Sequence, residues 1–296
     1  MRSGQPSSPI TRRTTTRVAL AVGVSVCLLT GAPLVREVTA AGPATPAPPG
    51  ARRTGAATVT AGDPSTLIAA IRSGSGERVR ALLATKPDVN APQPDGATAL
   101  HWAAHRDDLV SADLLLRAGA RVDAANDLGA TPLWLAAMNG SEAMVRRLLD
   151  AGADPNRAID SGETPLMAAA RSGNAGVIKA LTSRAASVNA HERLRGQTAL
   201  MWAADQQHPA AVRALIEAGA DVHARSAIWK QIENTAGNTN DRGDFEMSHG
   251  GSTALLFSAR RGDMESARLL LDAGANVNEA SAAGESALVI ATHSGQ

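Results

Sequence analysis

Aromatic residues are scarce in this chain. Its 296 residues include two Phe, four Trp and no Tyr, although 44% of the sequence is hydrophobic. Most of the apolar content is Ala, Leu and Val, which pack closely in thin layers without large rings. A large globular core usually contains more aromatic side chains. The composition therefore favours small stacked layers over one bulky core.

Cysteine is nearly absent, and the charge is balanced. Cys27 is the only cysteine, and it lies inside the apolar run near the N-terminus. If that segment is removed, the mature chain has neither disulfides nor thiolate metal sites, and it has no haem attachment motif. The formal net charge is +1, so no global electrostatic field points to nucleic acid.

The N-terminal segment has the pattern of an export signal. Arg12, Arg13 and other basic residues precede an apolar run over about 18–35, and small residues around Ala40 offer a cleavage site. We expect residues 1–40 to be a signal peptide, which implies export and no membrane contact after cleavage. The alternative is a retained membrane anchor, although glycines interrupt the run. Residues 41–62 are rich in Pro, Ala and Gly and predict a disordered tether.

A seven-residue pattern recurs along the rest of the chain. It reads TALHWAA from Thr98, TPLWLAA from Thr131, TPLMAAA from Thr164 and TALMWAA from Thr198, in steps of 33, 33 and 34 residues. The next step, from Thr198 to Thr253, is 55 residues, and the following step, from Thr253 to Ser286, is again 33. Self-similarity at a fixed period indicates stacked units rather than one compact core.

One unit, residues 126–158, predicts two short helices. Thr131 is suited to cap the first helix, and Pro132 suits its first turn, where a missing N–H is harmless. This helix should run to about Met138. A second helix over about 142–151 carries an apolar face that includes Leu148. Two short helices cannot bury such a face alone, so each unit should stack on its neighbours.

The TPL-x-x-AA and LL-x-x-GA helices, with the 33-residue period, resemble ankyrin repeats. The resemblance implies an all-α solenoid of antiparallel helix pairs with projecting β-turn fingers. It places an N-terminal cap and four repeats in 63–226, and one repeat with an incomplete last repeat in 250–296. Such proteins are typically non-catalytic scaffolds that bind protein without a cofactor. The incomplete last repeat suggests, as an alternative, a docking or regulatory module of a longer enzyme or electron carrier continuing beyond Gln296.

The resemblance also implies where a partner of unknown identity would bind. The expected surface is the concave side, built from the finger tips and the exposed ends of the first helices. The candidates at the turns are Asp95, Leu128, Arg195 and Gln197, and those on the helices are His105, Met138, Asn139, Arg171, Asp205, Gln206, Arg260 and Arg261. Trp102 and Trp202 share one slot in their units and are expected to pack between layers.

Two departures from the repeat pattern stand out. The segment 227–249 is predicted to be an insertion loop, and Trp229 and Phe245 within it are candidates for partner binding. A passive surface loop is the equal alternative, and its Arg-Gly-Asp tripeptide at 242–244 is best explained by chance. In the third repeat, Thr182 replaces an apolar residue and Ala185 replaces the usual Gly, which we interpret as harmless drift.

His101 and His105 lie four residues apart, so a helix could bring both onto one face as metal ligands. No Glu follows His101, so the zinc-protease pattern is absent. His101 also matches the family's TPLH position, where the ring commonly bonds to the backbone of a turn. We therefore predict a structural His101 and no metal site.

Overall fold

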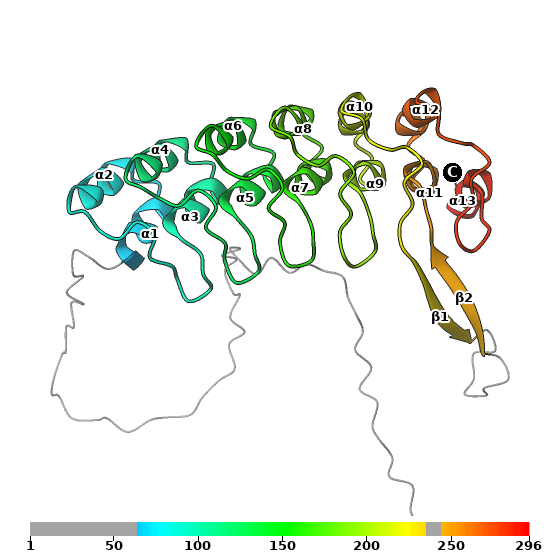
Figure 1. The fold of residues 1–296 in the computed structure, drawn as a ribbon, viewed down its shortest axis with the longest axis horizontal. Coiled ribbons are helices and arrows are strands. Elements are labelled where there is room, and N and C mark those ends of the chain that lie inside the picture. The colour runs from blue at the N-terminus through cyan, green and yellow to red at the C-terminus, as the bar shows by residue number, and fades with distance from the viewer. Residues whose placement is uncertain (1–63, 235–243, 296) are drawn as a thin grey trace, which may run out of the picture. The chain divides into compact units, whose positions relative to one another are not determined.

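The computed structural model describes residues 64–234 and 244–295, and the predicted signal peptide, the tether and the tip of the insertion lie outside them. Helices follow one another in pairs that stack side by side (Figure 1). The cap unit holds α1 (Pro64–Arg72) and α2 (Gly76–Ala84). Units one to five hold α3 (Ala99–His105) and α4 (Leu109–Arg117), α5 (Pro132–Met138) and α6 (Glu142–Asp150), α7 (Pro165–Ser172) and α8 (Ala175–Thr182), α9 (Ala199–Asp205) and α10 (Pro209–Glu217), and α11 (Ala254–Arg261) and α12 (Met264–Asp272). The last unit holds α13 (Ala287–His293).

The first helices begin where the sequence predicts. The Thr131 hydroxyl accepts a hydrogen bond from the backbone N–H of Trp134 at 3.2 Å, and Pro132 occupies the first helical turn. The N–H groups of the first helical turn have no partner within the helix. Thr131 accepts a hydrogen bond from one of them, and Pro132 has no N–H that would need a partner. The expected stack of antiparallel helix pairs is confirmed. None of the helices in the described ranges is long and apolar enough to cross a membrane.

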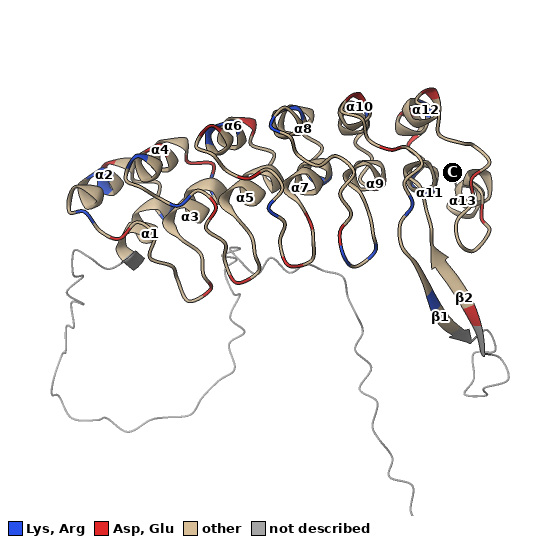
Figure 2. Ribbon diagram, viewed as in Figure 1, with Lys and Arg blue, Asp and Glu red and all other residues tan. Residues whose placement is uncertain are grey.

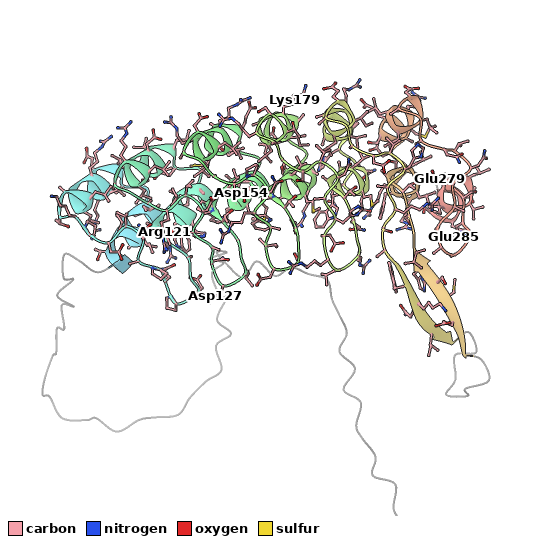
Figure 3. The ribbon with its side chains drawn as sticks, viewed as in Figure 1. Arg121, Asp127, Asp154, Lys179, Glu279 and Glu285 are labelled. Atoms are coloured by element: carbon pink, nitrogen blue, oxygen red, sulfur yellow. The ribbon has the colours of Figure 1, made fainter. Side chains whose placement is uncertain are left out.

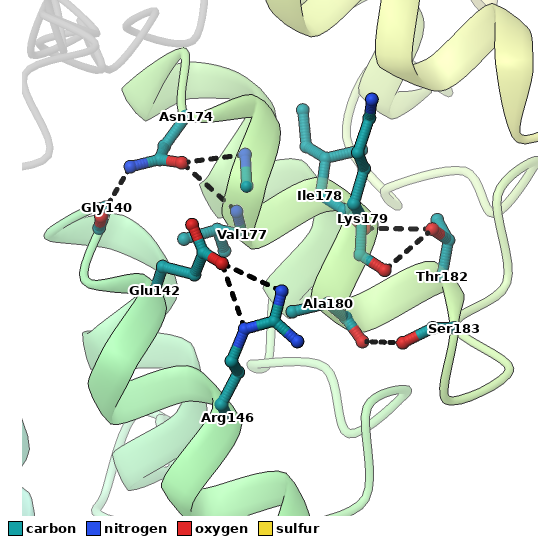
Figure 4. A network of polar contacts seen from close by, with 11 residues as sticks. Gly140, Glu142, Arg146, Asn174, Val177, Ile178, Lys179, Ala180, Thr182 and Ser183 are labelled. Carbon is teal, nitrogen blue, oxygen red and sulfur yellow. Dashed lines mark hydrogen bonds and ion pairs between the residues drawn. The ribbon is translucent and has the colours of Figure 1, made fainter.

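Caps of the second helices also join neighbouring units. In unit three the Asn174 side chain accepts from the N–H groups of Gly176 and Val177, at 2.9 and 3.1 Å (Figure 4). Its amide nitrogen donates to the carbonyl of Gly140 in unit two, at 2.7 Å. One side chain therefore caps its own helix and fixes the position of the unit before it.

The core is a continuous row of small and branched residues between the layers. Alanine pairs in the first helices, such as Ala103 and Ala104, are fully buried, which lets adjacent first helices approach closely. In the second helices Leu148 and Leu215 are also fully buried. Each first helix contacts the first helices on either side of it and its own second helix, from α3 to α11. Burial is thus shared between neighbours, as the repeat pattern predicts.

The fingers project from one edge of the stack, with Asp127 near a tip and Lys179 on the opposite, second-helix edge (Figure 3). One backbone hydrogen bond links each finger to the next. These bonds run from Asp127 N to Asp95 O, Asp160 N to Leu128 O, Arg193 N to Ser161 O, Ala227 N to Arg195 O and Ala282 N to Gly250 O, at 2.7–3.1 Å. Gly129 has a φ of 77°, and a Cβ there would lie 2.9 Å from Asp160, so this turn requires glycine.

The insertion contains two paired strands that form a β-hairpin, so the prediction of a loop over 227–249 is corrected. Strands β1 (Ile228–Asn234) and β2 (Asp244–Gly250) pair antiparallel, with Trp229 opposite His249 and Ile232 opposite Glu246. The physical reason is the presence of β-favouring residues on each side of a polar, glycine-containing centre, with Ile228, Trp229 and Ile232 before it and Phe245 after it. Lys230 and Glu246 form an ion pair across the strands, at 2.9 Å.

Unit three accommodates both of its departures from the repeat pattern. The Thr182 hydroxyl donates to the carbonyl of Ile178 at 3.0 Å, so it is satisfied within its own helix (Figure 4). Ala185 has a φ of 61°, the left-handed region that Gly152 and Gly219 occupy in neighbouring units. An alanine is strained there because its Cβ crowds the backbone. The substitution therefore carries a local conformational cost.

Candidate protein-binding face

The finger residues and the ends of the first helices line one common surface, which we call the inner face. In unit three Glu163 ends the finger and Arg171 lies on the last turn of α7. Their side chains form an ion pair with 2.7 Å between Oε2 and Nη2. The two rows of residues predicted separately, at the turns and on the helices, are therefore parts of the same face.

Arginines stack on aromatic rings at four places in this part of the molecule. The distances from the guanidinium carbon to the ring centre are 4.8 Å for Arg72 on Trp102, 4.1 Å for Arg171 on Trp202, 5.3 Å for Arg195 on Trp229 and 5.5 Å for Arg260 on Phe257. All are within the range in which the ring face attracts a cation. Three of the pairs, those of Trp102, Trp202 and Trp229, join successive units. Trp102 and Trp202 thus do pack between layers, as predicted, and each also carries an arginine.

Glu163 is the most unusual ionisable group of the inner face. Only 5% of the residue is exposed. Burial raises the pKa of its carboxyl above the ordinary 4.5, and the nearby Glu192 acts in the same direction, whereas Arg171 lowers it. Oε2 is paired with Arg171, while Oε1 has no hydrogen-bond partner among the described residues. The same guanidinium lies over the ring of Trp202.

Glu192 shapes the finger of unit four. It is 6% exposed, and its carboxylate accepts the backbone N–H groups of Leu194, Arg195 and Gln197 at 2.6–3.0 Å. The turn is therefore held rigidly from inside, and Leu194 and Arg195 are presented at its exposed tip. The tip then contacts the hairpin, because Arg195 stacks on Trp229 and Trp229 stacks in turn on His249, with ring centres 5.8 Å apart.

His101 is structural. Its Nδ1 accepts the backbone N–H of Thr98 at 3.0 Å, which leaves Nε2 as the protonated nitrogen that donates to the carbonyl of Ala130 at 3.0 Å. Both ring nitrogens are occupied, so His101 has no lone pair for a metal. Burial is the main reason that the pKa of His101 lies below 6.5. In the described ranges, no group of three or more His, Cys, Asp or Glu side chains could hold a metal ion.

Family models for ankyrin repeats match residues 67–159 and 156–226, and a single-repeat model matches 250–282. These matches cover more than half of the chain. The chain belongs to the ankyrin repeat family. A solved structure described as the human ASB11 ankyrin repeat domain has a TM-score of 0.62 and 28% sequence identity, and the match covers 76% of this chain and 90% of that one. Among curated proteins, none matches this sequence significantly.

As in ankyrin repeats generally, the expected mode of action is protein–protein interaction. Most of the residues predicted for this role have exposed or half-exposed side chains on the inner face. The exposed ones are Leu128, Asn139, Arg195, Gln206, Trp229, Arg260 and Arg261, and the half-exposed ones are Asp95, His105, Met138, Arg171, Gln197 and Asp205. The Phe245 side chain lies outside the described part.

Several of these side chains are already engaged within the ankyrin stack. Asp205 binds Arg261 of the next unit through two hydrogen bonds of 3.0 Å each. The Asn139 amide donates to the carbonyl of His105 at 2.7 Å, and the Asp95 carboxylate accepts the N–H of Ala97 at 3.1 Å. A partner would therefore meet Asp205 and Arg261 as a neutral pair rather than as separate charges.

Sequence reasoning missed three residues of the inner face. Arg72 occupies the slot seven residues after the capping position, the slot that holds Arg171 and Arg260, so the repeat register alone could have found it. Glu163 lies one residue before the cap, in the slot of the predicted Gln197. Leu194, 80% exposed at a finger tip, adjoins the predicted Arg195. The packing of Trp202 between layers was predicted, but its contact with Arg171 leaves no signal in the sequence.

Proposed function

We propose that the chain is a non-catalytic scaffold whose inner face binds a segment of a partner protein. The observation that carries the proposal is the set of arginines that lie over aromatic rings. A surface that only faces solvent would not need these pairs for the repeats to fold. Arg and Trp are enriched among the residues that dominate binding energy in protein interfaces. Stacking also restricts each guanidinium before binding, which reduces the entropy that association must overcome.

Exposed apolar side chains at the finger tips support the same proposal. Leu128 is 67% exposed and Leu194 is 80% exposed, and Trp229 on the hairpin is 38% exposed. Leu128 and Leu194 project from turns held by hydrogen bonds to Asn126 and Glu192, and Trp229 projects from strand β1. Apolar anchors beside fixed arginines are the composition that a protein-binding surface needs.

Site-specific photocrosslinking tests this proposal. A photoreactive amino acid at Gln206, an exposed inner-face position, should crosslink the full chain to a defined partner in the native host. The matched control is the same group at Arg146, which lies on the second-helix edge and pairs with Glu142 at 2.8 Å. Crosslinks of equal yield and identity from Gln206 and Arg146 would show that the inner face is not the binding surface.

We also propose that the chain acts after export. The support is the three-part pattern of residues 1–40, with its basic start, apolar run and small residues near Ala40. A chain whose only cysteine is Cys27 in that segment would reach an oxidising compartment without a thiol. Its fold relies on packing between repeats, which does not depend on redox conditions.

A further inference from the structure

Charge is distributed unevenly along the finger tips. Asp95, Asp127 and Asp160 lie at the tips in units one to three, whereas Arg193 and Arg195 lie at the tip in unit four (Figure 2). The first half of the finger row, in units one to three, is therefore acidic, whereas the finger tip of unit four is basic. A partner that lies along this row meets two regions of opposite sign.

Several basic side chains of units three to five are already paired with a carboxylate. Arg171 pairs with Glu163, Arg261 pairs with Asp205, and Lys230 pairs with Glu246. Arg195 and Arg260 differ, because within the described residues no carboxylate pairs with either of them. Both are exposed, and each lies over an aromatic ring.

A guanidinium held over a ring keeps the edge that carries its N–H groups available. That edge matches the two oxygens of a carboxylate, so a bidentate contact forms with little further ordering. Arg195 and Arg260 come from the finger of unit four and the first helix of unit five. Because these two units are neighbours in the stack, one extended segment that runs from one layer to the next passes both arginines.

We infer that Arg195 and Arg260 bind two carboxylates of an acidic, extended segment of a partner protein. An apolar side chain between the two carboxylates would contact the exposed part of Trp229. This inference rests on the proposed function and specifies the chemistry of the partner. A nucleic acid fits less well, because a long polyanion following the fingers would meet Asp127 and Asp160 in the acidic half.

The test uses the full chain and labelled ten-residue peptides. Each peptide carries a central Leu between two Glu residues, with the separation of the two Glu varied from one to six residues, and a matched set carries Gln in place of Glu. Fluorescence anisotropy measures the dissociation constants. We expect Glu peptides of at least one spacing to bind ten or more times more tightly than their Gln counterparts.

Variants locate the contact. Arg195→Gln and Arg260→Gln should each weaken binding of the best peptide by about 10- to 100-fold, the range for a lost hydrogen bond to a charged group. Arg260→Lys should restore only part of the loss, because lysine keeps the charge without the fork. The control is Arg268→Gln, the same change at an exposed arginine on the second helix of unit five, which should leave binding unchanged.

Three results would overturn the inference. Glu and Gln peptides could bind equally at every spacing, or Arg268→Gln could weaken binding as much as Arg260→Gln. A ten-nucleotide single strand could also bind as tightly as the best peptide and lose as much affinity in Arg260→Gln, which would reassign the surface to polyanions. If the inner face still crosslinks to a protein partner in any of these cases, the scaffold function stands and only the acidic segment is refuted.

Discussion

Two leucines in one repeat slot offer a direct test of how neighbouring units share stability. Leu149 and Leu271 both lie eighteen residues after the capping threonine of their units, on the second helices α6 and α12. Leu149 is 4% exposed because α8 follows α6 and covers it, whereas Leu271 is 40% exposed. In the described part of the chain, no second helix follows α12.

The exposed fractions of the two leucines determine how much unfolding free energy each substitution by alanine is expected to cost. Truncating a buried leucine to alanine costs about 2–5 kcal/mol of unfolding free energy, part of it from the cavity that remains. Leu271 buries only part of its surface and opens no closed cavity, so Leu271→Ala should cost about 1 kcal/mol. In a domain of this size, 1 kcal/mol shifts the melting temperature by about 2–4 °C. Leu149→Ala should therefore lower it clearly more.

Urea unfolding followed by far-UV circular dichroism measures both losses. Repeat arrays sometimes unfold in several steps, and a nearest-neighbour fit then assigns each loss to its unit. The two substitutions are identical in chemistry and share one helical slot, so helix-propensity effects cancel and the difference in buried surface remains. Equal losses at Leu149 and Leu271 would refute the reasoning that the following unit supplies the difference.

Three further predictions concern the strained turn, the buried histidine and the N-terminus. Ala185→Gly should raise stability by about 0.5–1 kcal/mol by relieving a positive φ, while Gly152→Ala in the matching turn should lower it, both measured by urea unfolding. The pKa of His101 is lowered in the folded chain, so as the pH falls the unfolded chain takes up this proton first. The contribution of neutral His101 to folding stability is therefore complete above pH 6.5 and is lost as the pH falls towards the pKa of the folded state. Unit three has Met167 at the position of His101. The substitution His101→Met should therefore reduce the dependence of the melting temperature on pH below pH 6.5, and an unchanged slope would contradict the role given to His101. N-terminal sequencing of protein from the native host should begin after Ala40, and an intact N-terminus on soluble cytoplasmic protein would disprove export.

The helices and their stacking could be predicted from the sequence because each unit repeats the same local signals. A threonine begins the first helix of each of units one to five, as Thr131 does in unit two, and the period places each apolar face against the next. The hairpin was missed because Trp229 and its partner His249 belong to strands separated by a polar segment, and the pairing is visible only when both are considered together.

The inner face was predicted in outline and missed in detail. The repeat register identified exposed slots such as those of Arg195 and Arg260. It did not show that Asp205 and Arg261 neutralise each other, because that pair joins residues 56 positions apart in different units. Nor did it show that Glu163 is buried, since the same slot holds the half-exposed Gln197 in unit four. Contacts between units depend on which residues happen to meet, and a single unit does not contain that information.

The backbone bonds that link the fingers have a consequence for protein engineering. The hairpin is rooted by Ala227 N to Arg195 O on one side and Ala282 N to Gly250 O on the other, the same kind of bond that joins ordinary fingers. The backbone bonds between units therefore involve only the base of a finger, and they form whether a short turn or a hairpin extends beyond it. A hairpin of this kind transplanted onto the finger of unit two, between Asp127 and Gly129, would give a two-armed receptor without redesign of the core.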